Sequence, residues 1–188
     1  DESVAAVFSS DSDWAGLHGV TGETRSRGGV LQTIGGMPVA WSSTWIGVML
    51  SSGEAETVTA SEAAKLALHM QYVADEMGLQ TYETIPIYVD ATTAIAFAEK
   101  SCGTGRMKHI DIRSAWVRVL RDRKRISLCK VNGELNPADF MTKILNAKDH
   151  TSWVEKHTVR VRALTSRGDN HGGMEKDTAD CQRECAKS

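Results

Sequence analysis

The sequence predicts one α/β domain with a mixed five-stranded sheet, in which three antiparallel strands precede parallel additions and helices flank the sheet. Strand-like segments come first, the hydrophobic period becomes helical at Ser51, and short apolar runs then alternate with helical segments. Parallel strands need such crossover helices, whereas antiparallel strands need only turns. The 188 residues, 41% of them hydrophobic, are enough to form one core.

The first quarter of the chain has the pattern of three consecutive strands. Residues 4–10 (VAAVFSS) form an apolar run that predicts the first strand. Residues 28–45 predict a hairpin, with Gly35 and Gly36 at its turn. Because such a turn joins antiparallel neighbours, we expect a three-stranded meander.

A long helix is predicted from Ser51 to Met77. Ser51 followed by Glu54 is the pattern of a capping box, and Gly78 is typical of the position after a helix end. Small apolar side chains recur between them at helical spacing, which favours close packing against a sheet. These residues are Ala60, Ala63, Ala64, Ala67 and Met70.

Strands and helices alternate in the second half of the chain. Residues 85–90 (IPIYVD) are a continuous apolar run that suits a buried central strand, and residues 126–131 (ISLCKV) predict the fifth strand. Two helices are predicted around the loop at 101–105, over residues 92–100 and 107–123.

Asn136-Pro137 predicts the N-cap and first position of a last helix over residues 137–145. We therefore expect a domain over residues 1–146. The polar composition of residues 147–188 predicts a largely disordered tail, with a short strand or helix within residues 151–164.

Composition also predicts the cellular location of the chain and the state of its cysteines. No apolar run approaches the length of a transmembrane helix, so we expect no membrane partner. The chain begins with Asp and no signal segment follows, which predicts a piece of a longer, intracellular polypeptide that is not secreted. The cysteines do not match a zinc site, and we expect reduced thiols. They are Cys102, Cys129, Cys181 and Cys185.

Four carboxylates stand at predicted strand ends or in the first turns of predicted helices: Asp11, Glu56, Asp90 and Asp139. A right-handed crossover after a meander returns the chain beside the first strand, so Asp11 and Asp90 are expected to meet. Mg²⁺ prefers oxygen ligands, and two ions about 4 Å apart catalyse in-line phosphoryl displacement. The four acids are therefore a candidate metal site.

Each acid also has a structural explanation when taken alone. Asp11 and Asp13 suit a polar turn after a strand. Glu56 interacts favourably with a helix dipole near the helix start. Asp90 suits an Asx cap and Asp139 a first-turn acid. Spacing alone leaves both interpretations open.

Five segments carry motifs of a known family, in the order in which that family has them. They are SDSDWAG (10–16), LSSGEAE (50–56), YVDATTAIAFAEK (88–100), MKHIDIR (107–113) and NPADFMTKIL (136–145). These segments resemble the ribonuclease H domain of copia-type retrotransposon Pol polyproteins, and the resemblance extends over about residues 5–146. Transposase and integrase cores share the fold, but the last two motifs point away from them.

The resemblance implies a ribonuclease H-like fold and endonucleolytic hydrolysis of the RNA strand of RNA–DNA hybrids during reverse transcription. It implies two Mg²⁺ or Mn²⁺ ions held by an Asp-Glu-Asp-Asp set. The motif positions of that set correspond to Asp11, Glu56, Asp90 and Asp139. It also implies an upstream reverse transcriptase domain in the same polyprotein, and a location in the cytoplasm, the nucleus or a virus-like particle.

The chain departs from the family pattern at positions that are not metal ligands. Ala91 replaces a usual Asn, Thr57 replaces an aromatic residue, and Ser114-Ala115 replaces a frequent Tyr-His. The loop before the last motif Asp also lacks the mobile His of many ribonucleases H, which leaves His109 as the nearby candidate for proton transfer. The alternative function is therefore a catalytically decayed domain that still binds nucleic acid.

Positive charge concentrates in residues 105–130, which contain nine Lys and Arg and two acids although the whole chain has a net charge of −2. Such a patch can neutralise nucleic-acid phosphates, and a solvated helix face is the alternative. Small polar residues beside the acids are also placed to meet a hybrid backbone. The predicted nucleic-acid-binding residues are Ser12, Ser52, Thr92, Arg106, Lys108, His109 and Arg113.

Overall fold

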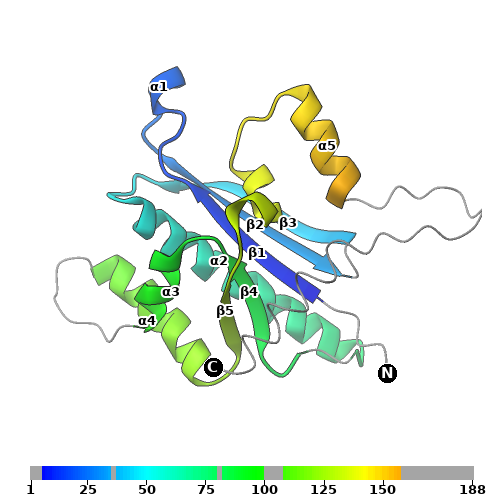
Figure 1. Ribbon diagram of the computed structural model, residues 1–188. Helices are drawn as coiled ribbons and strands as arrows, with labels where there is room; N and C mark the ends of the chain where they lie inside the picture. Colours follow the sequence, from blue (N-terminus) through cyan, green and yellow to red (C-terminus); the bar gives the residue numbers. More distant parts are fainter. Residues whose placement is uncertain (1–5, 35–36, 80–81, 100–107, 158–188) are drawn as a thin grey trace, which may run out of the picture.

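The strands form one sheet in the order β3-β2-β1-β4-β5 (Figure 1). The computed structural model describes residues 6–34, 37–79, 82–99 and 108–157. Within these ranges β1, β2 and β3 pair antiparallel, whereas β4 lies parallel to β1 and β5 parallel to β4. The predicted mixed sheet is confirmed. The strands are β1 Ala6–Asp13, β2 Ser26–Ile34, β3 Met37–Gly47, β4 Ile85–Val89 and β5 Ile126–Lys130.

Helices cover both faces of the sheet. The helices α2, α3 and α4 contact one another on one side, whereas η2 lies on the other side, against β1 and β2, and α5 packs on η2 (Figure 1). The α-helices are α1 His18–Thr21, α2 Ser52–Glu76, α3 Thr92–Glu99, α4 Lys108–Asp122 and α5 Ala147–His157. The 3₁₀ helices are η1 Gly133–Leu135 and η2 Pro137–Met141.

Two neighbouring glycines of β2 let both layers approach the sheet closely. Adjacent residues of a strand face opposite sides. A Cβ atom added to Gly28 would lie 2.8 Å from Oγ1 of Thr59 in α2, and one added to Gly29 would lie 2.7 Å from Cβ of Met141 in η2. Any larger residue at either position would therefore displace a packed layer.

The long helix starts as the sequence predicts. The Ser51 hydroxyl accepts a hydrogen bond from the Glu54 backbone N–H at 3.2 Å, and the Glu54 carboxylate accepts one from the Leu50 N–H at 2.6 Å. The alanine stripe is buried in the core with apolar side chains of the central strands. The helix ends before Gly78, whose φ of 68° is in the left-handed region that favours glycine.

The prediction of a last helix over residues 137–145 is wrong. The predicted N-cap is confirmed, because Asn136 Oδ1 accepts a hydrogen bond from the Ala138 N–H at 3.2 Å. The helix that follows is a short 3₁₀ segment that ends at Met141. In a longer α-helix the Met141 carbonyl would accept from residue 145. Here it accepts from the hydroxyl of Ser43 in β3 at 2.6 Å. A tertiary hydrogen bond thus replaces the next helical one.

Part of the predicted tail is ordered helix. Residues 147–157 form α5, where Trp153 stacks on Phe140 of η2 with a centroid distance of 4.0 Å. The predicted hairpin turn at 35–36, the loop at 101–105 and the tail beyond 157 lie outside the described residues.

The expectation of reduced thiols is wrong for Cys129, which is disulfide-bonded. The other three cysteines of the chain lie outside the described residues. None of the helices that the structure describes has the length and apolar character needed to cross a bilayer.

Candidate metal centre

Three of the four predicted acids meet at one end of the central strands. Ser10 of β1 pairs with Val89 of β4, so the next residues along these parallel strands are Asp11 and Asp90. Glu56 reaches them from the second turn of α2. Carboxylate oxygens of Asp11, Glu56 and Asp90 all lie within 4.8 Å of one another. This acidic triad could hold a divalent metal ion.

The Glu56 side chain is held in place by the strand that carries Asp11. Its Oε1 atom accepts hydrogen bonds from the Ser12 backbone N–H at 3.2 Å and from the Ser12 hydroxyl at 2.8 Å. Its Oε2 atom is buried without a hydrogen-bond partner, as is Oδ1 of Asp90. Two buried acceptor oxygens at the same site fit the ligand set of a metal ion, because buried polar atoms normally have partners.

Electrostatics favour a cation at the triad. Burial raises the pKa of Asp11 to about 6, with further increases from the nearby charges of Asp90 and Asp139, against the lowering effect of a hydrogen bond from Thr142. Burial likewise raises the pKa of Glu56 to about 7, assisted by the charges of Asp11 and Asp90. Clustered acids repel one another without a counterion. A divalent cation would remove that repulsion.

The fourth predicted acid lies beside the triad and not within it. Asp139 in η2 contributes to the raised pKa of Asp11, so it is within electrostatic reach. Its Oδ1 atom lies 2.5 Å from Nζ of Lys143, and the pKa of that lysine is raised chiefly by the same contact. A role of Asp139 as a metal ligand therefore stays a prediction.

Two residues that were not selected from the sequence as site residues fix η2 to β1. Asn136 donates from Nδ2 to the Ser10 carbonyl at 2.8 Å. The Thr142 hydroxyl donates to Oδ2 of Asp11. Both residues lie within the last motif, over residues 136–145, and this position is the signal in the sequence that could have identified them. Helical spacing does not reveal that their side chains reach β1.

The predicted nucleic-acid-binding residues have different surroundings. Ser12 is engaged with Glu56, whereas Ser52 and Thr92 are exposed at the first positions of α2 and α3. Arg113 donates to Oε1 of Glu62 at 2.6 Å and to the Ser61 hydroxyl at 3.1 Å, so it binds α4 to α2. Arg106 and the side chains of Lys108 and His109 lie outside the described residues.

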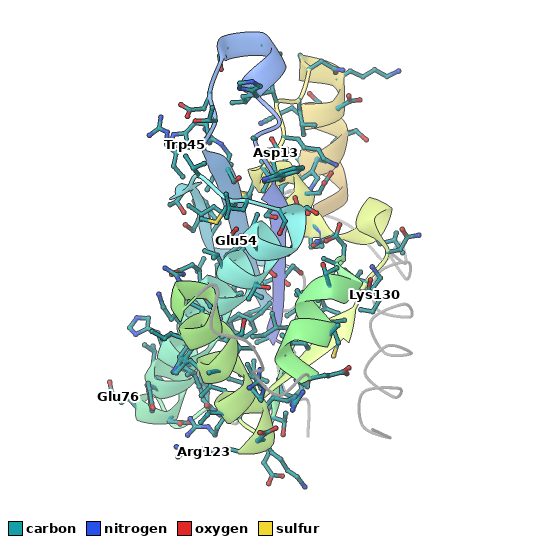
Figure 2. The ribbon with its side chains drawn as sticks, turned by 90° about the vertical axis from the view of Figure 1, so that its left-hand side faces the viewer. Asp13, Trp45, Glu54, Glu76, Arg123 and Lys130 are labelled. Carbon is teal, nitrogen blue, oxygen red and sulfur yellow. The ribbon has the colours of Figure 1, made fainter. Side chains whose placement is uncertain are left out.

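Part of the basic segment lies far from the triad. Figure 2 shows Arg123 toward the opposite end of the molecule from Asp13, which is two residues after Asp11 in the chain. Arg121 pairs with Asp122 at 2.8 Å, and Arg125 donates to Gln71 at 2.8 Å. Folding contacts therefore occupy several of these basic side chains.

Comparisons with known proteins agree with this architecture. No protein-family model matches the sequence. The chain is 33% identical over 132 residues to a retrovirus-related Pol polyprotein from transposon TNT 1-94 of Nicotiana tabacum, a match that covers 70% of this chain and 10% of that polyprotein. The chain thus spans about a tenth of the curated relative it matches.

Two solved structures share the fold. One is LC11-RNase H1 in complex with an RNA/DNA hybrid, at 14% identity and a TM-score of 0.51, covering 73% of this chain and 94% of that one. The other is the N-terminal RNase H domain of Rv2228c from Mycobacterium tuberculosis, solved as a fusion with maltose-binding protein. It has 11% identity and a TM-score of 0.52, and the match covers 81% of this chain and 98% of that one.

Proposed function

We propose that this chain, a ribonuclease H-fold domain of the copia-type retrotransposon Pol family, hydrolyses the RNA strand of RNA–DNA hybrids with divalent metal ions. The observation that carries the proposal is the convergence of Asp11, Glu56 and Asp90 at a buried point with two unpaired acceptor oxygens. The LC11 relative was solved with an RNA/DNA hybrid, which supports the same substrate here.

The proposed cofactor is a pair of Mg²⁺ or Mn²⁺ ions. The triad would provide most protein ligands, and Asp139 would complete the set after its contact with Lys143 opens. Hard oxygen ligands of this kind suit these ions. When bound, two such ions supply an activated water and stabilise the leaving oxygen of a phosphodiester.

Side chains around the triad hold the proposed metal ligands in position, and their burial sets the pKa values of the ligand carboxyl groups. Ser12 holds one oxygen of Glu56 and leaves the other available. Thr142 fixes the orientation of Asp11 by donating to Oδ2. The raised pKa values of Asp11 and Glu56 mean that metal binding displaces protons from them near neutral pH.

Substrate contacts are assigned to residues around the triad. Ser52 and Thr92 are exposed at helix starts, where backbone N–H groups and small polar side chains suit phosphate oxygens. Arg106, Lys108 and His109 remain proposed contacts, whereas Arg113 is proposed to act through the packing of α4.

The match to a retrovirus-related Pol polyprotein supports our proposal that the domain acts in an intracellular retrotransposon cycle. We assign the domain a role in reverse transcription, with a reverse transcriptase domain of the same polyprotein as its partner. Removal of the RNA template strand from a hybrid is the chemistry that such a cycle requires of this domain.

A cleavage assay tests the proposal. Purified protein with Mg²⁺ is expected to cut an end-labelled RNA strand in an RNA–DNA hybrid and to leave the same RNA uncut when it is single-stranded. Asp90→Asn should abolish cleavage, whereas the control Asp122→Asn, at an exposed position at the end of α4, should not change it. Active Asp90→Asn protein would refute the assignment, and hybrid binding without any cleavage would identify a decayed domain.

A further inference from the structure

Two arginines gather around one tryptophan at the end of the β2–β3 ribbon. The guanidinium carbons of Arg25 and Arg27 lie 4.7 Å and 4.3 Å from the ring centroid of Trp45. The tryptophan is 37% exposed although it is a large aromatic residue. We call these three residues the Trp45 cluster. An exposed cation–π contact adds little to folding stability, so stability alone does not explain the arrangement.

Strand register places Arg27 and Trp45 of the Trp45 cluster on the same sheet face as Asp11. Asp11 pairs with Gly29, two residues further along β1 Asp13 pairs with Arg27, and Arg27 pairs with Trp45. Paired residues and residues two apart share a face. From the strand spacings, the backbones of Arg27 and Trp45 lie about 8 to 12 Å from that of Asp11. Figure 2 shows Trp45 and Asp13 toward the same end of the molecule.

The helix turn that holds Asp11 also orients the Trp45 cluster. Arg27 donates from Nη1 to the Ser43 hydroxyl at 3.1 Å, and that hydroxyl donates to the Met141 carbonyl of η2 at 2.6 Å. The next residue, Thr142, donates to Asp11. The cluster and the candidate metal centre are thus built on one set of contacts.

The charge of Arg27 is available for a ligand. Arg25 is bound by Glu23 through Nε at 2.9 Å and Nη2 at 2.6 Å. Arg27 has no carboxylate ion pair among the residues that the structure describes, and its guanidinium has further N–H donors beyond the one used. A guanidinium beside an aromatic face is suited to a nucleic-acid strand, because it binds phosphate while the ring stacks on a base or sugar.

We propose that the Trp45 cluster binds the hybrid beside the cleavage point, at a phosphate about two to four nucleotides from the cut. This inference rests on the proposed function and adds a subsite to it. Arg27 would bind the phosphate, Trp45 would stack on the neighbouring nucleotide, and Arg25 would support the ring. The positive guanidinium and the shared face with Asp11 select a nucleic-acid strand over a protein partner.

A truncation series tests the subsite. A short ribonucleotide patch in a DNA duplex fixes the cut, and the duplex is shortened one base pair at a time on either side. Fluorescence anisotropy with Mg²⁺ in the Asp90→Asn background measures binding without cleavage. The parent, which is the Asp90→Asn protein, is expected to bind the hybrid about tenfold more weakly once the duplex has been shortened to about three nucleotides from the cut.

Variants of the Trp45 cluster should not show this loss of affinity when the duplex is shortened. Arg27→Ala and Trp45→Ala are expected to bind the longest duplex about tenfold more weakly and the shortest duplex like the parent. Arg27→Lys should recover part of the loss, and Arg27→Ala should reduce the salt dependence of binding by about one phosphate contact. The controls Trp41→Ala and Lys148→Ala change exposed residues outside the cluster. Both should still show the tenfold loss of affinity when the duplex is shortened.

The outcomes separate the two proposals. If the cluster variants bind every duplex like their parent, the subsite is refuted even if the wild type cleaves. If the wild type does not cleave but the loss of affinity on shortening requires Arg27 and Trp45, the proposed function fails and the subsite stands. If the parent binds no hybrid, the subsite is refuted, and the proposed function fails as well if the wild type does not cleave. Because Arg27 and Trp45 are both partly exposed, thermal unfolding of their variants should match the parent and confirm that the variants fold.

Discussion

The Thr142 hydroxyl donates a hydrogen bond to Oδ2 of Asp11, although 131 positions separate the two residues in the chain. This contact joins the end of η2 to the strand that carries the triad. Because a hydrogen bond to an ionised carboxylate favours the ionised form, it lowers the pKa of Asp11 against the effect of burial. The contact therefore keeps a buried acid ready for metal binding.

Removal of this hydroxyl should weaken metal binding. In Thr142→Val the pKa of Asp11 rises further, so more protons must leave when metal binds. We expect about three- to tenfold weaker Mg²⁺ affinity near pH 7, from the usual net strength of an intramolecular hydrogen bond. Titration calorimetry measures the affinity. Thr142→Ser should retain it, and equal affinities in the Val variant and the wild type would contradict the role of the hydroxyl.

The metal-free domain should lose stability as pH rises through neutrality. The folded-state pKa values of Asp11, about 6, and Glu56, about 7, lie above the ordinary carboxyl values of 3.8 and 4.5. The folded chain thus binds protons that the unfolded chain has released. This stabilisation is fully present below about pH 4 and is lost as pH rises through 6 and 7, by at most about 3 kcal/mol for each acid.

A difference measurement isolates this effect. Urea unfolding in EDTA should show that Asp11→Asn is more stable relative to wild type at pH 8 than at pH 5, and Asp122→Asn should show no such trend. Saturating Mg²⁺ should restore the wild type at pH 8, because ligand that binds only the folded state stabilises it. A wild type whose metal-free stability rises from pH 5 to pH 8 relative to Asp11→Asn would contradict the prediction.

A methyl group at Gly29 should disturb the η2 layer. The added Cβ would lie 2.7 Å from Met141 and 2.8 Å from Cγ2 of Thr142, closer than real contacts permit. Gly29→Ala is expected to lower the free energy of unfolding by about 1–3 kcal/mol and to reduce Mg²⁺ affinity through Thr142. Gly19→Ala is the control, because nothing lies within 4 Å of its Cβ position. Equal denaturation midpoints for the two variants would refute this packing account.

Loss of the Lys143 charge should strengthen metal binding. Lys143 pairs with Asp139, and its raised pKa also reflects the charges of Asp11 and Asp90. Because a positive side chain near the site opposes a metal cation, Lys143→Met should raise Mg²⁺ affinity by about two- to fivefold at low salt. The comparable Lys65→Met change, which opens the Lys65–Glu62 pair on α2, should have no effect. Unchanged affinity in Lys143→Met would mean that the lysine does not compete with metal.

Local patterns predicted the parts of the fold that depend on local chemistry. Ser51 and Glu54 specify the start of α2, and the continuous apolar run before Asp90 specifies a buried strand, because caps and periodicity are properties of neighbouring residues. The meeting of Asp11 and Asp90 followed from chain-crossover rules. The end of the last helix did not follow, because it depends on Ser43, a residue distant in sequence.

The sequence by itself determined the sheet, the start of α2 and a set of four candidate acids that includes the three that meet, because strand order and helix starts follow from short-range signals and connection rules. Only the tertiary structure decided that Asp139 pairs with Lys143 and that Thr142 reaches Asp11. It also decided that Arg27 and Trp45 share a face with Asp11. These relationships depend on register and on close approach of separate layers, which no local spacing encodes.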